Sequence, residues 1–204
     1  NAGWVTAAAA MAKRITRCEQ LVYLPEMPVD EEKMLADIEK SYAKGNGLLV
    51  TVSEGIRGLD GKPLADTGIV DGFGHVVPGG TAQYISDQII RKLGLKSRAE
   101  KPGLLGRTSI PYVSLVDRKE AYEVGSFAVE SALRGESGFM VAIEADRKPS
   151  YSSRLFLTPL KNVANAEKKF PLQWIVDGNQ IADEFFQYAD PLMGEKFPEY
   201  AFLR

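Results

Sequence analysis

Two short apolar runs separated by a helical pattern constrain the fold of this chain more than any other feature. Leu48 to Val52 is the clearest buried-strand pattern, and Gln20 to Leu24 is a second one. Between them, Asp30 is placed to cap a helix that runs to Lys44 and is followed by glycine. A strand, a helix and a strand in this order predict a right-handed crossover between parallel strands. The sequence therefore predicts an α/β fold, a parallel three-layer sheet with helices on both faces.

Length and composition predict an ordinary globular protein. The chain has 204 residues, of which 45% are hydrophobic and 25% are charged, enough to bury a substantial single core. The pattern of elements changes after Ile143, where a polar turn and shorter strand-like and helical patterns follow. We therefore expect one domain over residues 1–204, with residues 146–204 as a C-terminal extension packed on it.

Charge and cysteine content exclude several classes of function. The formal net charge of -2 gives no electrostatic reason to expect a nucleic-acid partner or an anionic membrane. The single cysteine excludes an internal disulfide and a Cys-rich metal site, and the single histidine excludes a multi-His site. The longest apolar runs are far shorter than the ~20 residues of a membrane span. These features predict no membrane, no nucleic acid, no metal ligands and a reducing, cytoplasmic location.

The first residues read as a helix that is already under way. Asn1-Ala-Gly-Trp4 leads without an initiator methionine into an alanine-rich helical pattern that ends near Arg14. Small side chains on one side of such a helix permit close packing on a sheet. The chain looks cut at this point, although a self-contained domain with trimmed first residues is the alternative.

Two glutamates follow the predicted strands directly. Pro25 and Pro28 restrict the loop that carries Glu26, and Glu54 occupies the corresponding position after the second strand. Open α/β sheets bind ligands beyond the carboxyl ends of their strands, so a carboxylate here can accept hydrogen bonds from substrate hydroxyls. The alternative for both residues is a structural strand-end glutamate, which for Glu54 hydrogen-bonds nearby backbone, and from the residues alone we favour this alternative for both.

The segment from Arg98 to Arg107 has the features of an anion clamp. Its two arginines flank a short apolar run bracketed by Pro102, Gly103 and Gly106, where the backbone can turn and approach a ligand closely. A helix follows from Asp117 to Gly135, with Ala121, Val124, Ala128 and Ala132 as its predicted inner stripe, and then a buried strand over residues 139–143.

A glycine-rich segment over residues 71–84 precedes another predicted helix, which Thr81 caps. Glycines before a helix N-terminus can hold a phosphate, but the spacing matches neither the P-loop nor the dinucleotide fingerprint, so we favour close backbone packing. His75, the one histidine, is interpreted as a hydrogen-bonded structural residue, because no suitable nucleophile lies near it in the sequence.

Four stretches, in order and spacing, resemble the C-terminal, sugar-phosphate half of the phosphofructokinase family. They are Asn1-Ala-Gly-Trp-Val-Thr-Ala-Ala, Leu24-Pro-Glu-Met-Pro, Leu49-Val-Thr-Val-Ser-Glu-Gly and the segment from Arg98 to Gly135. The ending Pro191-Leu-Met-Gly-Glu-Lys-Phe-Pro-Glu-Tyr resembles the pyrophosphate-dependent members in particular. The resemblance covers most of the chain and implies a phosphofructokinase-like fold.

The resemblance also assigns substrate-binding residues. It implies that Glu26 accepts hydrogen bonds from the hydroxyls of fructose 6-phosphate. Gly103-Leu-Leu-Gly-Arg107 matches the Gly-Tyr-Glu-Gly-Arg element of the pyrophosphate enzymes, which implies that Arg107 contacts the sugar phosphate. Arg98 matches an arginine that reaches the 6-phosphate across a subunit interface. Leu104 departs from the tyrosine of that element, which puts one polar contact to the substrate in doubt.

The catalytic parts of the family have no counterpart in this sequence. Its Gly-Gly-Asp donor loop and its Thr-Ile-Asp element lie before the region that resembles this chain, so we expect no catalytic residue here and Mg²⁺ ligands elsewhere. The implied function in glycolysis and gluconeogenesis is phosphoryl transfer from pyrophosphate to the 1-hydroxyl of fructose 6-phosphate, with this chain supplying the acceptor side.

Two alternatives and an expected assembly complete the interpretation. The alternatives are an ATP-dependent 6-phosphofructokinase and a non-catalytic sugar-phosphate-binding or regulatory subunit, which Leu104 makes conceivable. The expected partners are fructose 6-phosphate, pyrophosphate or ATP, and either further copies in a dimer or tetramer or a complementary N-terminal chain.

Overall fold

The computed structural model describes residues 2–16, 18–45, 47–70, 72, 76–147, 150–194 and 201. The chain divides into two compact units, each described separately below. Unit 1 contains residues 1–103, 169–183 and 199–204, and unit 2 contains residues 104–168 and 184–198. Neither boundary falls at residue 146, where the sequence placed the start of a C-terminal extension.

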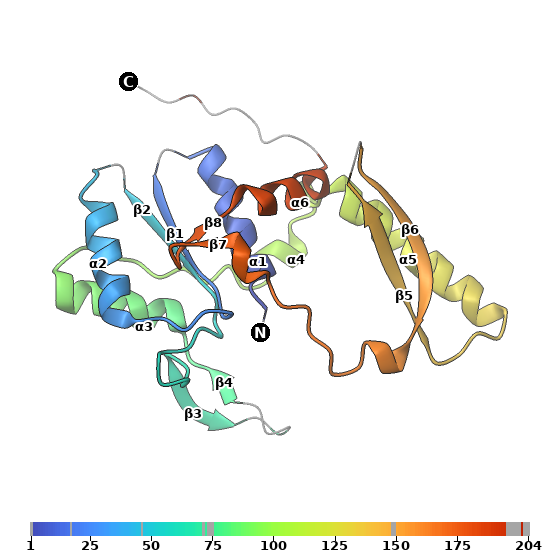
Figure 1. The fold of residues 1–204 in the computed structure, drawn as a ribbon, viewed down its shortest axis with the longest axis horizontal. Helices are drawn as coiled ribbons and strands as arrows, with labels where there is room; N and C mark the ends of the chain where they lie inside the picture. The colour runs from blue at the N-terminus through green and yellow to red at the C-terminus, as the bar shows by residue number, and fades with distance from the viewer. Residues whose placement is uncertain are drawn as a thin grey trace. The chain divides into compact units, whose positions relative to one another are not determined.

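The centre of unit 1 is the predicted pair of parallel strands (Figure 1). Strand β1 (Glu19–Tyr23) pairs in parallel with β2 (Leu48–Val52), with Leu21 opposite Val50. The connection between them is helix α2 (Glu31–Tyr42). The predicted strand, helix and strand are therefore confirmed, and both strands end at the same edge of the pair.

Helix α2 forms for the reason that the sequence indicates. The Asp30 carboxylate accepts hydrogen bonds from the backbone N–H groups of Glu32 and Lys33, which satisfies two donors at the helix start. Met34, Leu35 and Ile38 are buried against Leu21 and Tyr23. Tyr42, the fourth member of the predicted inner stripe, is instead 43% exposed.

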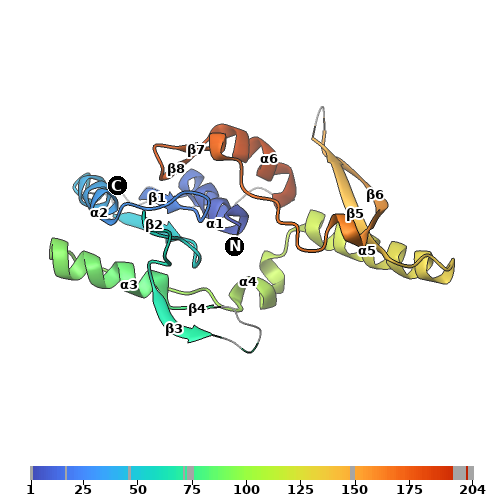
Figure 2. The same cartoon turned by 60° about the horizontal axis from the view of Figure 1, so that its bottom comes forward.

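Helices cover both faces of the pair (Figures 1 and 2). Helix α3 (Thr81–Gln88) continues into a π-helical turn (Ile89–Leu93), and Ile85 and Ile89 join the same buried cluster as α2. On the other side, α1 (Trp4–Ala8) and a 3-10 helix (Ala9–Arg14) pack on β1. This arrangement gives unit 1 the three layers that the sequence predicts.

The last part of unit 1 closes the outer edge of β1. The backbone N–H of Val22 donates to the carbonyl of Asn179, and the Gln180 amide donates to the carbonyl of Gln20. A 3-10 turn (Leu172–Trp174) and the short antiparallel strands β7 (Ile175–Val176) and β8 (Gln180–Ile181) make up this segment. Ile181 was expected to begin the final helix and lies in β8 instead.

A second hairpin of unit 1 replaces part of a predicted loop. Turn residues in the sequence predict a loop over residues 57–71, but residues 66–70 form strand β3 (Asp66–Val70), which pairs antiparallel with β4 (Val76–Pro78) beyond that region. The predicted turn at Asp60-Gly61 is present, because Gly61 takes the left-handed conformation with φ +76°. Thr81 is the first residue of α3 rather than its cap, which is Gly80. His75 lies outside the described residues.

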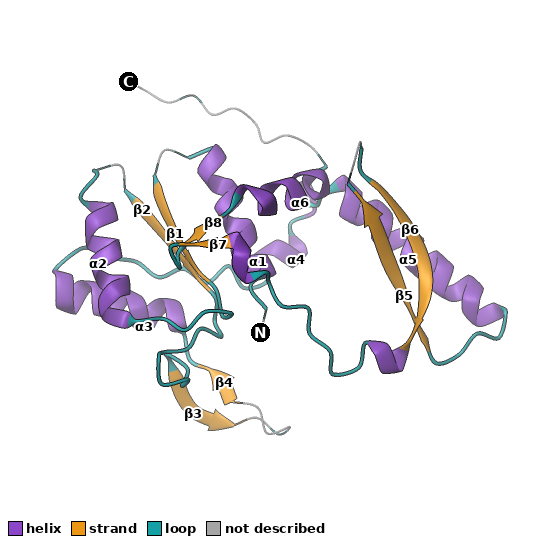
Figure 3. Ribbon diagram, in the orientation of Figure 1, coloured by secondary structure: helices purple, strands orange, loops and turns teal. Residues whose placement is uncertain are grey.

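Unit 2 contains a long helix beside an antiparallel hairpin (Figure 3). Helix α5 (Leu115–Leu133) contacts strand β5 (Phe139–Asp146), which pairs antiparallel with β6 (Ser152–Pro159). The cap of α5 is Ser114, whose hydroxyl accepts a hydrogen bond from the N–H of Asp117, and not Asp117 itself. Strand β5 is half-exposed rather than buried.

Short elements complete unit 2. They are α4 (Leu105–Thr108), two 3-10 turns (Ile110–Tyr112 and Leu160–Asn162) and helix α6 (Asp183–Met193). Helix α6 continues past Ala189, where the sequence placed the start of an irregular tail, and contains Pro191. The helix predicted between residues 158 and 169 is reduced to the second 3-10 turn.

Candidate functional site

Glu26 lies beyond the carboxyl end of β1 and connects two distant parts of unit 1. Its Oε1 accepts hydrogen bonds from the backbone N–H groups of Gly3 and Phe170, both at 2.9 Å. Its Oε2 is buried and has no hydrogen-bond partner among the described residues. A side chain at position 3 would collide with this oxygen, because a Cβ on Gly3 would lie 2.6 Å from Oε2. One carboxylate oxygen therefore holds the backbone, and the other is left as an acceptor.

Aromatic side chains surround the two backbone groups that Glu26 holds. Trp4 contacts Phe170 edge-on with 5.2 Å between ring centroids, and Trp174 packs against both rings. Phe170 is 1% exposed. This packing fixes the backbone at Gly3 and Phe170, and with it the orientation of the Glu26 carboxylate.

Tyr23, the last residue of β1, lies just before this loop. Its side chain is 5% exposed, and burial raises the pKa of the Tyr23 hydroxyl to about 12, with the nearby Asp37 carboxylate adding to the shift. The Asp37 carboxylate accepts a hydrogen bond from the Asn179 side chain. Burial therefore keeps the Tyr23 hydroxyl neutral, and the Asp37 carboxylate is hydrogen-bonded.

Glu54 occupies the equivalent position after β2, and its contacts are of two kinds. Its backbone carbonyl accepts a hydrogen bond from the Thr81 hydroxyl at 3.0 Å, which ties the strand end to the start of α3. Its carboxylate forms an ion pair with Lys101 at 2.8 Å on the surface. The side chain therefore faces the surface at the strand edge and is not used in backbone hydrogen bonding.

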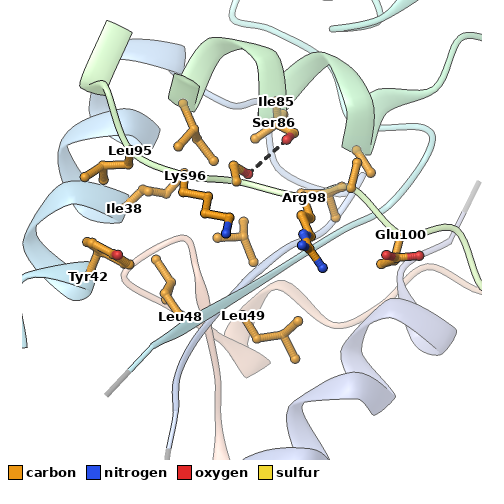
Figure 4. A pocket seen from close by; sticks show the side chains of 16 residues that line it. Ile38, Tyr42, Leu48, Leu49, Ile85, Ser86, Leu95, Lys96, Arg98 and Glu100 are labelled. Carbon is orange, nitrogen blue, oxygen red and sulfur yellow. Dashed lines mark hydrogen bonds between the residues drawn. The ribbon is translucent and has the colours of Figure 1, made fainter. Parts of the chain in front are cut away.

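Arg98 lies in an extended segment that lines a pocket of about 220 Å³ in unit 1 (Figure 4). Exposure alternates along this segment, so Lys96, Arg98 and Glu100 are exposed and the residues between them are partly buried. Ser97 is anchored by a hydrogen bond of 2.9 Å between its hydroxyl and that of Ser86 in α3. The anchor directs the odd-numbered side chains inward and leaves the charged ones at the opening.

The pocket has an apolar wall and a charged rim of Lys96, Arg98 and Glu100. Ile38, Leu48 and Ile85 form part of the apolar lining, and in Figure 4 the Lys96 and Arg98 side chains extend over the opening toward β2. Within the described part of the chain, neither cation has an ion-pair partner. The sequence reasoning did not identify Lys96, although its spacing of two from Arg98 in an extended segment places both on one side.

Arg107 lies in unit 2, in the last turn of α4, and its side chain is exposed. The predicted turn before it is present, because Gly103 takes the left-handed conformation with φ +57°. Leu104, the departure from the family element, is 66% exposed. Glu26 and Arg98 thus belong to unit 1 and Arg107 to unit 2, and the convergence of all three on one ligand stays a prediction.

The described residues contain no site that suits a divalent metal. No group of three or more His, Cys, Asp or Glu side chains in that part of the chain is arranged to hold a metal ion. The described helices also include none that is long and apolar enough to cross a membrane. The pocket rim suits binding of an anion, because Lys96 and Arg98 have no ion-pair partner there, whereas Glu26 is not among the residues that line this pocket.

Comparison with known proteins finds similarity to one family. The family model described as phosphofructokinase matches residues 1–132. A pyrophosphate–fructose 6-phosphate 1-phosphotransferase from Methylococcus capsulatus is 38% identical over 98% of this chain, and one from Halomonas elongata is 37% identical over 98%. These alignments cover 49% and 48% of the two relatives, so the chain spans about half the length of the curated relatives it matches.

A solved structure agrees with the sequence comparisons. The crystal structure of a pyrophosphate-dependent phosphofructokinase from Nitrosospira multiformis matches 98% of this chain with a TM-score of 0.78 and 30% identity, and the match covers 47% of that protein. The likeness includes the α/β architecture described above. With its family match over residues 1–132, the chain belongs to the phosphofructokinase family.

Proposed function

We propose that this chain supplies the fructose 6-phosphate side of the active site in a pyrophosphate-dependent phosphofructokinase. The observation that carries the proposal is the identity of 38% with the Methylococcus relative over 98% of the chain, a region that includes Glu26, Arg98 and Arg107. The exposed, unpaired arginine at the pocket rim supports it, because phosphate binding requires a cation that no carboxylate neutralises.

Each candidate residue has a defined role in this proposal. Arg98 and Arg107 bind the 6-phosphate, since a planar guanidinium can donate two parallel hydrogen bonds to phosphate oxygens. Glu26 accepts a hydrogen bond from a sugar hydroxyl through Oε2, while Oε1 keeps the Gly3 and Phe170 backbone in place. Binding would therefore combine electrostatic attraction to the phosphate with recognition of the sugar.

The chemical step is assigned to groups outside this chain. The complete protein transfers a phosphoryl group from pyrophosphate to the 1-hydroxyl of fructose 6-phosphate, and catalysis depends on positioning and charge neutralisation. Mg²⁺ would supply part of that neutralisation. The described residues offer no ligand set for it. We further propose a cytoplasmic protein of glycolysis and gluconeogenesis that acts as an oligomer or with a complementary N-terminal chain.

Calorimetric titration with fructose 6-phosphate tests the assignment of the arginines. Arg98→Ala and Arg107→Ala should each weaken binding by roughly tenfold to hundredfold, because each loses a charge-assisted hydrogen bond of about 1.5 to 3 kcal/mol. Arg91→Ala is the matched control, since Arg91 is exposed in the same unit and does not line the pocket. Unchanged affinity in both arginine variants would remove these residues from the site.

Glu26 needs a variant that separates binding from folding. Glu26→Ala removes the acceptor for two backbone N–H groups, and we expect it to destabilise unit 1 as well as to weaken binding. Glu26→Gln keeps one oxygen for those groups and replaces only the second with a donor. The glutamine variant should retain the wild-type unfolding midpoint within a few degrees yet bind fructose 6-phosphate more weakly. Equal affinity of Glu26→Gln and wild type would exclude the hydroxyl-binding role.

A further inference from the structure

The segment over residues 169–183 returns to the loop that carries Glu26. The backbone N–H of Phe170 donates to Glu26 Oε1 at 2.9 Å, across 144 residues of sequence. The rest of the segment contains β7 and β8, lies beside β1 and α1 (Figures 1 and 2) and is joined to β1 by the hydrogen bonds of Asn179 and Gln180. The phosphofructokinase model matches residues 1–132 and so does not include this segment. A candidate sugar-binding residue is therefore held by a part of the chain outside the family match.

Gly3 donates the second hydrogen bond to Glu26, and the close approach there suits glycine alone. Its backbone N–H lies 2.9 Å from Oε1, as that of Phe170 does. Its φ of -76° is one that residues with side chains also adopt, so the backbone conformation does not require glycine. The space does, because a Cβ here would lie 2.6 Å from Glu26 Oε2 and 3.0 Å from Leu24 Cδ2. Since the carboxylate ends a flexible side chain, an alanine at position 3 would displace Oε2 before it displaced the backbone.

Trp174 anchors the segment against the donors on both sides of Glu26. Its ring contacts Phe170 edge-on with 5.8 Å between centroids, and it contacts Trp4, the neighbour of Gly3, with 6.1 Å. Edge-to-face aromatic pairs have a preferred geometry and stabilise the packing beyond the area that they bury. One indole ring therefore keeps both backbone N–H groups in place relative to the Glu26 carboxylate.

We propose that the segment over residues 169–183, anchored by Trp174, acts together with Gly3 to position the Glu26 carboxylate for sugar recognition. Two N–H groups on Oε1 prevent the carboxylate from rotating, so Oε2 is presented in one direction. Oε2 is buried without a donor among the described residues, and a ligand hydroxyl that donates to it removes the cost of that burial. The inference rests on the proposed function of Glu26 and extends it to positioning residues that act through this side chain.

Amide NMR tests the geometry without a ligand. A backbone N–H that donates to a carboxylate makes a charge-assisted hydrogen bond, which Glu26→Gln converts to a neutral one. The variant should therefore move the amide proton resonances of Gly3 and Phe170 together. The amide of Gly55, which lies 2 residues after Ser53 and donates to its hydroxyl, is the internal reference and should not move. Unchanged resonances of Gly3 and Phe170 in Glu26→Gln would overturn the inference.

Calorimetric titration of this chain with fructose 6-phosphate tests the positioning role. Gly3→Ala and Trp174→Ala should each weaken binding by roughly threefold to tenfold, the effect of one misdirected hydrogen bond. Gly55→Ala is the matched control for Gly3→Ala, because the nearest atom to its Cβ would be 3.9 Å away. Leu172→Ala is the control for Trp174→Ala, because Leu172 lies in the same 3-10 turn and is 59% exposed. Both controls should bind as the wild type does, within about twofold.

The same two variants in a Glu26→Gln background separate positioning from a general structural role. If Gly3 and Trp174 act through the Glu26 carboxylate, each should then add less than about a further twofold loss. Losses that multiply in full would overturn the inference, and so would wild-type affinity of Gly3→Ala in a chain whose binding Glu26→Gln weakens. Gly3→Ala leaves the aromatic cluster intact, so the test does not depend on the folding of Trp174→Ala. Equal affinity of Glu26→Gln and wild type, or no binding by the wild type, would overturn the proposed role of Glu26 and the inference with it.

Discussion

Helices α2 and α5 are both regular and capped, yet they differ in which of their side chains are buried. Helix α2 places Met34, Leu35 and Ile38 in a buried cluster with residues of β1 and α3. Helix α5 is longer, but its two buried residues are Glu120 and Ser131, and its apolar residues Val129 and Leu133 are 60% and 83% exposed. Unit 1 therefore contains its own hydrophobic core, whereas unit 2 has regular secondary structure without one. The difference predicts that unit 1 resists local unfolding more strongly than unit 2 does.

The largest expected effect is on the core of unit 1. Met34→Ala should lower the free energy of unfolding of unit 1 by about 2 to 5 kcal/mol, because a side chain that is 1% exposed is replaced by a cavity. Leu133→Ala on α5 removes a side chain of similar size that is 83% exposed. It should change the free energy of unfolding by less than about 0.5 kcal/mol. Urea unfolding followed by tryptophan fluorescence measures both, since Trp4 and Trp174 lie in unit 1. Equal losses in the two variants would contradict the contrast between the units.

A smaller effect is expected at high pH and should come from Tyr23. Its folded-state pKa is raised from 10.0 to about 12 by burial, so the folded state favours the neutral phenol. The resulting stability is complete below pH 10 and is lost as the pH rises from 10 through 12, a loss of about 3 kcal/mol. Tyr23→Phe cannot ionise and should lack this part of the alkaline destabilisation. Urea unfolding at pH 9 and at pH 11.5 measures the difference, and parallel losses in wild type and variant would exclude Tyr23 as the source.

The helix caps give the smallest and most local comparison. Asp30→Ala should cost about 1 kcal/mol of unit 1 stability, because two backbone N–H groups lose their acceptor. Ser114→Ala removes the corresponding acceptor for Asp117 at the start of α5. If the two units unfold independently, only Asp30→Ala shifts the tryptophan-detected transition. A shift of the same size with Ser114→Ala would show that the units unfold together.

Sequence patterns identified the elements of unit 1 because local and tertiary preferences agree there. The Asp30 cap, the apolar positions of α2 and the apolar runs of β1 and β2 each indicate one structure, and all are present. In α5 the apolar residues surround the helix, so periodicity does not determine which face is buried. Of the predicted inner stripe, Ala121, Ala128 and Ala132 are therefore exposed, and only Val124 is partly buried.

Sequence patterns predicted only part of the candidate site. The position of Glu26 after a strand could be predicted, but its hydrogen bond to Phe170 spans 144 residues of sequence, and no local pattern contains it. Hairpin β3–β4 lies in a region whose glycines suggested a loop, because turn residues mark the ends of a hairpin more clearly than its strands. Lys96 became a candidate only when the extended segment placed it beside Arg98.

Hydrogen exchange measured by mass spectrometry tests the central claim most directly, that the buried apolar core of the described residues lies in unit 1 and that α5 of unit 2 has little of it. In the isolated chain, β1, β2 and α2 should exchange slowly, and α5 should exchange at least about tenfold faster, because local stability follows buried apolar contact. Protection of α5 equal to that of β1 in the isolated chain would contradict the account.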